Sequence, residues 1–161
     1  MKKTSAVLLA ISFLVITGCS DKTTNEIQER NGLAYLPNES TPFTGTLETK
    51  FPNGQKEAEI HYKDGQLNGL GTMWSENGQK KSEGNYKDGK LNRLATTFFE
   101  NGQKKLERNY KDGQENGLMT TFFENGQKES EINFKDGKLI NINRDGKLIN
   151  FNKDGKLINI N

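Results

Sequence analysis

The chain has few of the residues that build catalytic or metal centres. Its 161 residues contain one cysteine, Cys19, and one histidine, His61. A single cysteine excludes an intramolecular disulfide. The two residues are also too few for a zinc site of the usual ligand types, or for a Cys-His or Ser-His nucleophile system. The sequence therefore predicts a protein that is not an enzyme and that holds no metal and no cofactor.

The chain also lacks a strong charge of either sign. It has 23 basic and 21 acidic residues, and two of the basic ones, Lys2 and Lys3, lie in an N-terminal segment that we expect to be removed. Without that segment the two signs balance, and no block of basic residues remains. The electrostatic footprint of a nucleic-acid-binding protein is missing. We therefore expect no nucleic-acid partner.

A third absence is that of an apolar run long enough to cross a bilayer. The apolar run of residues 6–16 has about half of the roughly 20 residues that a spanning helix needs. Residues 1–18 instead have the features of a cleaved targeting segment. The motif Ile16-Thr17-Gly18-Cys19 resembles the bacterial lipobox. That resemblance implies a lipoprotein signal peptide, after whose removal Cys19 carries a diacylglycerol and an acyl chain such as palmitate. An ordinary secretory peptide with an incidental cysteine is the alternative.

The lipobox resemblance also implies a location. Buried acyl methylenes contribute about 0.8 kcal/mol each, so a multiply acylated terminus is a stable anchor. We expect the protein to be lipid-anchored to the cell membrane through Cys19, on the extracytoplasmic side. Ser20 follows the cysteine. In Gram-negative lipoproteins a residue other than Asp at this place implies the outer membrane, facing the periplasm or the surface. Residues 19–31 are polar and predict a flexible tether.

What the chain has in abundance is repetition. An Asn-Gly-Gln-Lys motif recurs with a spacing of 24 residues, at Asn53, Asn77, Asn101 and Asn125. An aromatic residue followed by Lys-Asp-Gly recurs with the same spacing, at Tyr62, Tyr86, Tyr110 and Phe134. Such a period indicates one supersecondary unit that is stacked many times.

Asn-Gly and Asp-Gly mark the reversals of the chain, because both dipeptides tolerate the positive φ of two-residue hairpin turns. The strands between them run antiparallel to their neighbours, and no stretch after residue 18 has convincing helical periodicity. The sequence therefore predicts an all-β fold, an elongated single-layer antiparallel β-meander of hairpin repeats with a period of 24.

Three segments are predicted after the tether. Residues 32–50 resemble a degenerate capping hairpin, and residues 51–134 hold the regular 24-residue repeats. Residues 135–161 form a tail of three nearly identical nonapeptides of the form Lys-Asp-Gly-Lys-Leu-Ile-Asn-Ile-Asn. These units could continue the sheet as short hairpins. Because their Leu-Ile-Asn-Ile-Asn runs are a pairing hazard, we expect low order in the tail or its association with another chain.

Alternation along the strands assigns residues to the two faces of the sheet. Ala58, Ile60 and Tyr62 share one face, which is the better candidate for a core. Adjacent phenylalanines at 98–99 and 122–123 must point to opposite faces, so both faces carry aromatic residues. An open aromatic stripe would be a binding surface or a self-association seam. Its predicted members occupy one repeat position: Trp74, Phe98 and Phe122.

Two polar series could suggest chemistry. Four glutamates share one repeat position, two strands or roughly 9.5 Å apart, a spacing that overlaps that of an inverting glycosidase pair: Glu59, Glu83, Glu107 and Glu131. Their equivalence offers no asymmetry to separate an acid from a base. We therefore expect a solvated face balanced by lysines, with weak cation or polycation binding as the alternative. His61 corresponds to Asn85 and Asn109, which suggests a solvent-facing polar position.

Residues 76–92, Glu-Asn-Gly-Gln-Lys-Lys-Ser-Glu-Gly-Asn-Tyr-Lys-Asp-Gly-Lys-Leu-Asn, resemble the MORN repeat variant family. The resemblance covers about residues 32–140. The family carries the name of YwqK-type toxin-antitoxin antitoxins. Gly69 and Gly117 fit a glycine of the family pattern, whereas Arg93 replaces it, and we expect a less regular array at that position.

The resemblance and the lack of catalytic groups imply a membrane-tethered, non-catalytic binding module in the cell envelope, whose partner is a protein, a glycan or a lipid. Two alternatives remain. One is an antitoxin or immunity protein that neutralises a partner toxin. The other is a structural envelope protein that self-assembles through its tail.

Overall fold

The computed structural model describes residues 22–152 and 154–160. These residues form strands, turns and loops, and no helix. The strands are β1 (Lys22–Thr24), β2 (Gln28–Arg30), β3 (Leu33–Tyr35), β4 (Gly45–Lys50), β5 (Lys56–Lys63), β6 (Gln66–Trp74), β7 (Lys80–Lys87), β8 (Lys90–Phe98), β9 (Lys104–Lys111), β10 (Gln114–Phe122), β11 (Lys128–Lys135), β12 (Lys138–Arg144), β13 (Lys147–Phe151) and β14 (Leu157–Ile160).

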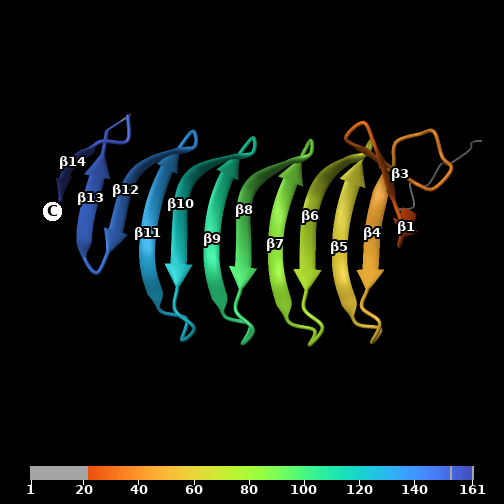
Figure 1. The fold of residues 1–161 in the computed structure, drawn as a ribbon, viewed down its shortest axis with the longest axis horizontal. Helices are drawn as coiled ribbons and strands as arrows, with labels where there is room; N and C mark the ends of the chain where they lie inside the picture. The colour runs from red at the N-terminus through yellow and green to blue at the C-terminus, as the bar shows by residue number, and fades with distance from the viewer. Residues whose placement is uncertain (1–21, 153, 161) are drawn as a thin grey trace, which may run out of the picture.

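Twelve of these strands form one sheet, in the order β1-β4-β5-β6-β7-β8-β9-β10-β11-β12-β13-β14. From β4 onward each strand pairs antiparallel with the next strand of the chain, and β1 pairs in parallel with β4. The strands lie side by side along the long axis of the molecule (Figure 1). The predicted all-β, single-layer antiparallel meander is confirmed.

The two kinds of turn differ from each other. At five Asp-Gly turns, from Asp64 to Asp145, both residues have positive φ, as Asp64 at 51° and Gly65 at 78° show, and the predicted two-residue turn is present. The turn at Asp154-Gly155 differs, because the Asn152 amide donates to the Lys156 carbonyl (2.8 Å) and the Gly155 amide donates to the Asn152 carbonyl (3.0 Å). At the Asn-Gly turns the prediction is wrong, because the loop has three residues. The Gly54 amide donates to the Phe51 carbonyl (2.9 Å) and the Phe51 amide donates to the Gln55 carbonyl (2.8 Å). Of the Asn-Gly pair, only Gly54 has positive φ, at 85°.

The asparagine side chain explains the longer loop. Asn101 Oδ1 accepts a hydrogen bond from the Gln103 amide two residues on (2.9 Å), an arrangement that favours a turn without positive φ at the asparagine itself. Asn101 Nδ2 also donates to the Glu124 carbonyl in the next Asn-Gly turn (2.9 Å). At the opposite end of the strands, the Gly113 amide donates to the Leu91 carbonyl of the preceding hairpin (2.8 Å). Both rows of turns therefore link neighbouring repeats.

Each even-numbered strand of the regular repeats contains a bulge at the glycine of the sequence pattern. Gly69 and Gly117 have φ of 110° and 105°, and Arg93 adopts 78° at the same place. Arg93 pairs with Tyr110 in the register with which Gly69 pairs with Tyr86. The expected irregularity is absent, so the backbone holds a non-glycine residue in the left-handed region.

The bulge also accounts for His61, which is half-buried. Its Nδ1 lies 2.6 Å from the Leu70 carbonyl oxygen on the bulged strand. At the equivalent position Asn109 Nδ2 donates to the Leu118 carbonyl (2.8 Å). The polar residue at this position thus provides a hydrogen-bond partner for a carbonyl beside the bulge, in addition to facing solvent.

The N-terminal part departs from the simple hairpin and tether. Strands β1 and β2 lie within residues 19–31, and β3 pairs with β2 rather than with β4. Ala34 and Phe43 are buried in this cap, and the Phe43 ring lies 5.9 Å from that of Tyr62. The Ala34 amide donates to the Gly65 carbonyl (2.8 Å). The cap therefore covers the first Asp-Gly turn.

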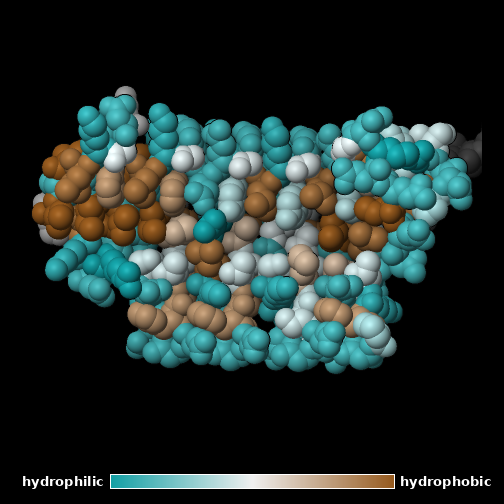
Figure 2. All heavy atoms as spheres, viewed as in Figure 1, coloured by the Kyte–Doolittle hydropathy of each residue, from teal (hydrophilic) through white to brown (hydrophobic). Residues whose placement is uncertain are grey.

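In the tail the sheet continues through β12, β13 and β14. Ile142, Ile149 and Ile160 follow one another in register across these strands. Apolar residues gather at this end of the molecule (Figure 2). The expectation of low order is not met by the described residues of the tail, which form the short paired strands that the nonapeptides also allowed.

Candidate functional site

One face of the sheet carries a row of residues that lie opposite one another across the strands. From β5 to β11 the row is Ile60, Gly71, Gly84, Ala95, Arg108, Met119 and Ile132. Three consecutive members, Gly71, Gly84 and Ala95, are small. Because a side chain is missing or minimal at these places, the face is hollow between larger residues.

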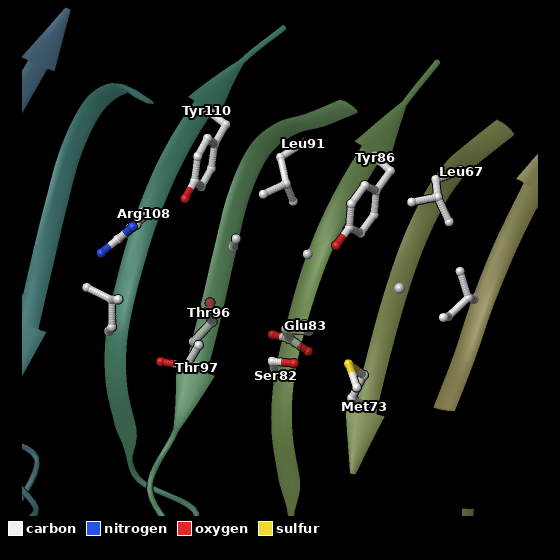
Figure 3. Close-up of a pocket in the computed structure, with 15 residues that line it drawn as sticks. Leu67, Met73, Ser82, Glu83, Tyr86, Leu91, Thr96, Thr97, Arg108 and Tyr110 are labelled. Carbon is white, nitrogen blue, oxygen red and sulfur yellow. The ribbon is translucent and has the colours of Figure 1, made fainter. Parts of the chain in front are cut away.

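This hollow is a cavity of about 350 Å³ whose floor includes the three small residues. Its size falls in the range of about 300–1,000 Å³ of small-molecule sites. The walls are mostly apolar and come from β5 to β9 (Figure 3). The residues that form them include Leu67, Met73, Tyr86, Leu91, Leu106 and Tyr110.

Tyr86 depends on the glycines beneath it. Its Cε2 atom lies 3.1 Å from the place that a Gly71 Cβ would take and 3.6 Å from that of a Gly84 Cβ. The ring therefore packs against the sheet where no side chain intervenes. Ser82 and Thr97 add hydroxyl groups at the side of the hollow nearer the Asn-Gly turns (Figure 3). An apolar ligand with few polar atoms suits such a lining.

A charged residue stands at the β9 end of the hollow. Arg108 Nη1 lies 3.0 Å from Glu115 Oε1 on β10. Arg108 Nε is buried and has no hydrogen-bond partner among the described residues. The Arg108 side chain extends from β9 toward β10 (Figure 3). Sequence reasoning missed this site, although the break in the repeat at 84 and 108 was visible in the sequence.

The opposite face has a different character. Its central row alternates glutamates with threonines, as Glu59, Thr72, Glu83 and Thr96 show. Thr72, Thr96 and Thr120 are buried. Each predicted glutamate has a lysine partner three residues earlier, with Lys80 2.7 Å from Glu83 and Lys104 2.6 Å from Glu107. The lysine-balanced face is confirmed.

At the cap end of this face the Glu48, Lys56 and Glu59 side chains interact. Lys56 Nζ lies 2.5 Å from Glu59 and 3.2 Å from Glu48. Hydrogen bonds to Glu59 and then Glu48 raise the Lys56 pKa above its ordinary value. The hydrogen bond from Lys56 lowers the Glu48 pKa. These shifts favour the charged forms, as in a structural ion pair.

The predicted aromatic residues Trp74, Phe98 and Phe122 lie on the face opposite the hollow, at the strand ends near the Asn-Gly turns, and they are half-buried. Each has a lysine as its register partner, so lysines alternate with the rings along the row: Trp74 with Lys80, Phe98 with Lys104 and Phe122 with Lys128. Lys56 Nζ also lies 5.5 Å from the Trp74 ring centre. The row is thus a series of separated rings. Its role in binding stays a prediction.

Other predicted features are located only in part. Cys19 lies outside the described residues. Within residues 22–152 and 154–160, no group of three or more His, Cys, Asp or Glu residues is placed to hold a metal ion. The same part of the chain contains no helix of the length and hydrophobicity needed to span a bilayer.

Comparison with known proteins agrees with the repeat architecture. The profile of the MORN repeat variant family matches the chain over residues 43–64, 67–88, 94–112 and 115–136. A comparison with curated proteins gave no match. One similar solved structure is a mutant of TarM from S. aureus in complex with fondaparinux, α-GlcNAc-glycerol and UDP, with 11% sequence identity and a TM-score of 0.30. That likeness covers 82% of this chain and 20% of the TarM chain.

Proposed function

The chain belongs to the MORN repeat variant family, and we propose that it is a non-catalytic binding module, tethered to a membrane of the cell envelope through acylated Cys19, that receives its ligand in the hollow over Gly71, Gly84 and Ala95. The repeats themselves are typical of binding modules, which are built by stacking one unit into an extended surface.

The hollow carries this proposal. If all repeats were equivalent, each would place a large side chain at this position of the row, as the repeats with Ile60 and Ile132 do. The second repeat has Gly84 instead, and Gly71 and Ala95 flank it in register. The cavity is therefore a local departure from the repeat. Binding without chemistry fits its lining, which lacks the paired groups of an acid-base or nucleophilic centre.

The test of this proposal is to fill the hollow. Gly84→Ile introduces the residue that stands at 60 and 132, and the φ of Gly84 lies outside the left-handed region. The new Cβ would lie 3.0 Å from Leu91 Cδ2, a movable side-chain end. We expect the wild-type full chain to bind the uncharged apolar dye Nile red with enhanced fluorescence, and Gly84→Ile to lose most of this signal. Met119→Ile, in the same row beyond the hollow, is the matched control.

Equal dye binding by the wild type and Gly84→Ile would refute the hollow as the binding site. The predicted aromatic row then becomes the alternative, and changing Trp74, Phe98 and Phe122 to Ser tests it with the same dye. For the tether, globomycin treatment of expressing cells is expected to cause a precursor to accumulate. Absence of that precursor would refute the lipoprotein proposal.

Self-assembly is a second candidate function, favoured by one observation in the tail. Leu157, Ile158 and Ile160 of β14 are 56%, 62% and 59% exposed. Exposed apolar strands of this kind pair readily with other chains. A Cys19→Ala chain is expected to associate in a concentration-dependent way, and the same chain ending at Phe134 to remain monomeric. If the longer chain is also monomeric in sedimentation, self-assembly is excluded under those conditions.

A further inference from the structure

Two positions in the third repeat depart from the pattern together. Arg108 stands where the other repeats have Ile60, Gly84 and Ile132. Glu115 stands where they have leucine, at Leu67, Leu91 and Leu139. The two charged side chains form an ion pair across β9 and β10, with 3.0 Å between Nη1 and Oε1. An ion pair thus replaces two apolar residues at one end of the hollow.

The pair leaves the guanidinium incompletely satisfied. Glu115 engages Nη1, while the buried Nε has no partner within the described residues. A buried donor without an acceptor is destabilising, and such a group in a native structure calls for an explanation, for example a bound acceptor. Glu115 engages Nη1 and not the edge formed by Nε and Nη2. That edge has the geometry for a bidentate contact with a second anion, once the atoms that cover Nε move aside.

We propose that the ligand of the hollow is a single-chain amphipathic anion, whose carboxylate or phosphate binds Arg108 and whose alkyl chain lies over Ala95, Gly84 and Gly71. This inference rests on the proposed function, because it assigns a ligand class to the same cavity. The order of the row places the head group at the β9 end. From there the chain extends across β8 and β7 toward Ile60, which closes the far end of the row.

The backbone of the sheet favours an alkyl chain over a peptide. Each strand from β5 to β9 pairs with a neighbour on both sides. The backbone N–H and C=O groups beneath the hollow therefore already have partners. A peptide laid across this face would lose water from its own amides and gain few hydrogen bonds in return. An alkyl chain has no such groups, and burying it is favourable in proportion to its apolar area.

The experiment measures retention of three C12 probes by the immobilised full chain, each below its micelle concentration. The probes are dodecanoate, dodecyl phosphate and dodecyltrimethylammonium. We expect both anions to bind the wild type at least about tenfold more tightly than the cation, since a charge-assisted contact is involved. The ratio between the two anions tells a carboxylate ligand from a phosphate ligand.

Variants that restore the residues of other repeats separate the head-group contact from the cavity. Arg108→Ile is expected to weaken dodecanoate binding about tenfold. Nile red is uncharged and makes no charge-assisted contact with Arg108, so its binding should weaken much less. Glu115→Leu is expected to strengthen dodecanoate binding, because it removes a negative charge that lies next to the bound anion and repels it. The double variant Arg108→Ile with Glu115→Leu should fold like the apolar repeats and bind all three probes alike.

Two results would overturn the inference. One is equal affinity of the wild type for the anions and the cation. The other is dodecanoate binding that does not change in Arg108→Ile, checked in the double variant in case the single one is unfolded. In both cases the proposed function survives if Nile red still binds and Gly84→Ile still abolishes the dye signal. Loss of that dye result would instead refute the cavity itself.

Discussion

Arg93 offers a direct test of the strain in the repeat, because it occupies a backbone position that the neighbouring repeats give to glycine. Its φ is 78°, against 110° at Gly69 and 105° at Gly117. Holding a residue that has a Cβ in the left-handed region lowers the stability of the folded state by about 1–3 kcal/mol. Arg93→Gly should therefore stabilise the fold, although removing a contact surface usually does the opposite.

The size of the gain follows from two opposing effects. Relief of the strained φ contributes about 1–3 kcal/mol, and the greater freedom of glycine in the unfolded chain takes back about 0.5–1 kcal/mol. We expect a net stabilisation of about 1 kcal/mol, which is about 3 °C in melting temperature for a protein of this size. The reverse change, Gly69→Ala, should destabilise, because its Cβ would also lie 3.2 Å from the His61 Cβ.

The assay is urea unfolding of the wild type, Arg93→Gly and Arg93→Ala, followed by circular dichroism. Arg93→Ala is the matched control, since it removes the side chain but keeps the Cβ that causes the strain. The glycine variant should exceed the alanine variant by about 1–2 kcal/mol, the strain term less the entropy of glycine, with the same dependence on urea. If the two variants have equal midpoints, the strain argument is refuted.

Three further predictions concern the turns, the cap and the tail. Asn101→Ala should lower the free energy of unfolding in urea by about 1 kcal/mol, because the Asn101 side chain bonds both the Gln103 amide and the next turn. Asn125→Ala should lower it less, because among the described residues the Asn125 side chain bonds only Gln127 of its own turn. Burial and then the charge of Glu29 raise the pKa of Tyr62 above 10.0. Because the folded state disfavours the charged phenolate, the full stability is present below pH 10.0 and decreases as the pH rises through the raised pKa. Tyr62→Phe has no such group, so it should be more stable than the wild type at pH 11 but not at pH 8. Urea unfolding at the two pH values measures the difference. Deleting residues 152–161 should reduce concentration-dependent association measured by light scattering.

The sequence predicts the architecture well because the turn signals are local. Asp64-Gly65 predicts a two-residue reversal from two adjacent residues, and its copies at 88, 112, 136 and 145 predict the next ones. Bonds from distant residues, such as that of the Asp64 amide to Thr44 Oγ1 (2.8 Å), add to a turn that the dipeptide already favours. The length of the Asn-Gly loop is less evident. There the Asn53 side chain bonds the Gln55 amide (2.9 Å), so the turn closes over three residues instead of two.

The site was harder to predict because it depends on register. Gly71, Gly84 and Ala95 come from three strands and become neighbours only once the bulges are placed. The register in β5 and β6 shifts by two residues around Gly69, and repeat spacing alone does not reveal such a shift. The same applies to the aromatic row, where Lys80 becomes the partner of Trp74 only through the bulge beside it.

The cap and the tail show the limit in another way. Strand β1, Lys22–Thr24, has no apolar alternation, and it forms because the edge of β4 offers unpaired backbone groups in parallel register. Strand β1 thus forms because of the sheet edge beside it rather than because of its own sequence. For this reason its sequence pattern predicts a tether.

The shared register of the repeats makes the cavity movable in principle. Every strand contributes one residue to the same row, so the place and length of the hollow depend only on which strands carry small residues there. Ile60→Gly would extend it toward the cap, and Ile132→Gly would open a separate pocket beyond Met119. In such a sheet, substitutions in this one row can move the ligand-binding cavity by one strand at a time, without any change to the turns that connect the strands.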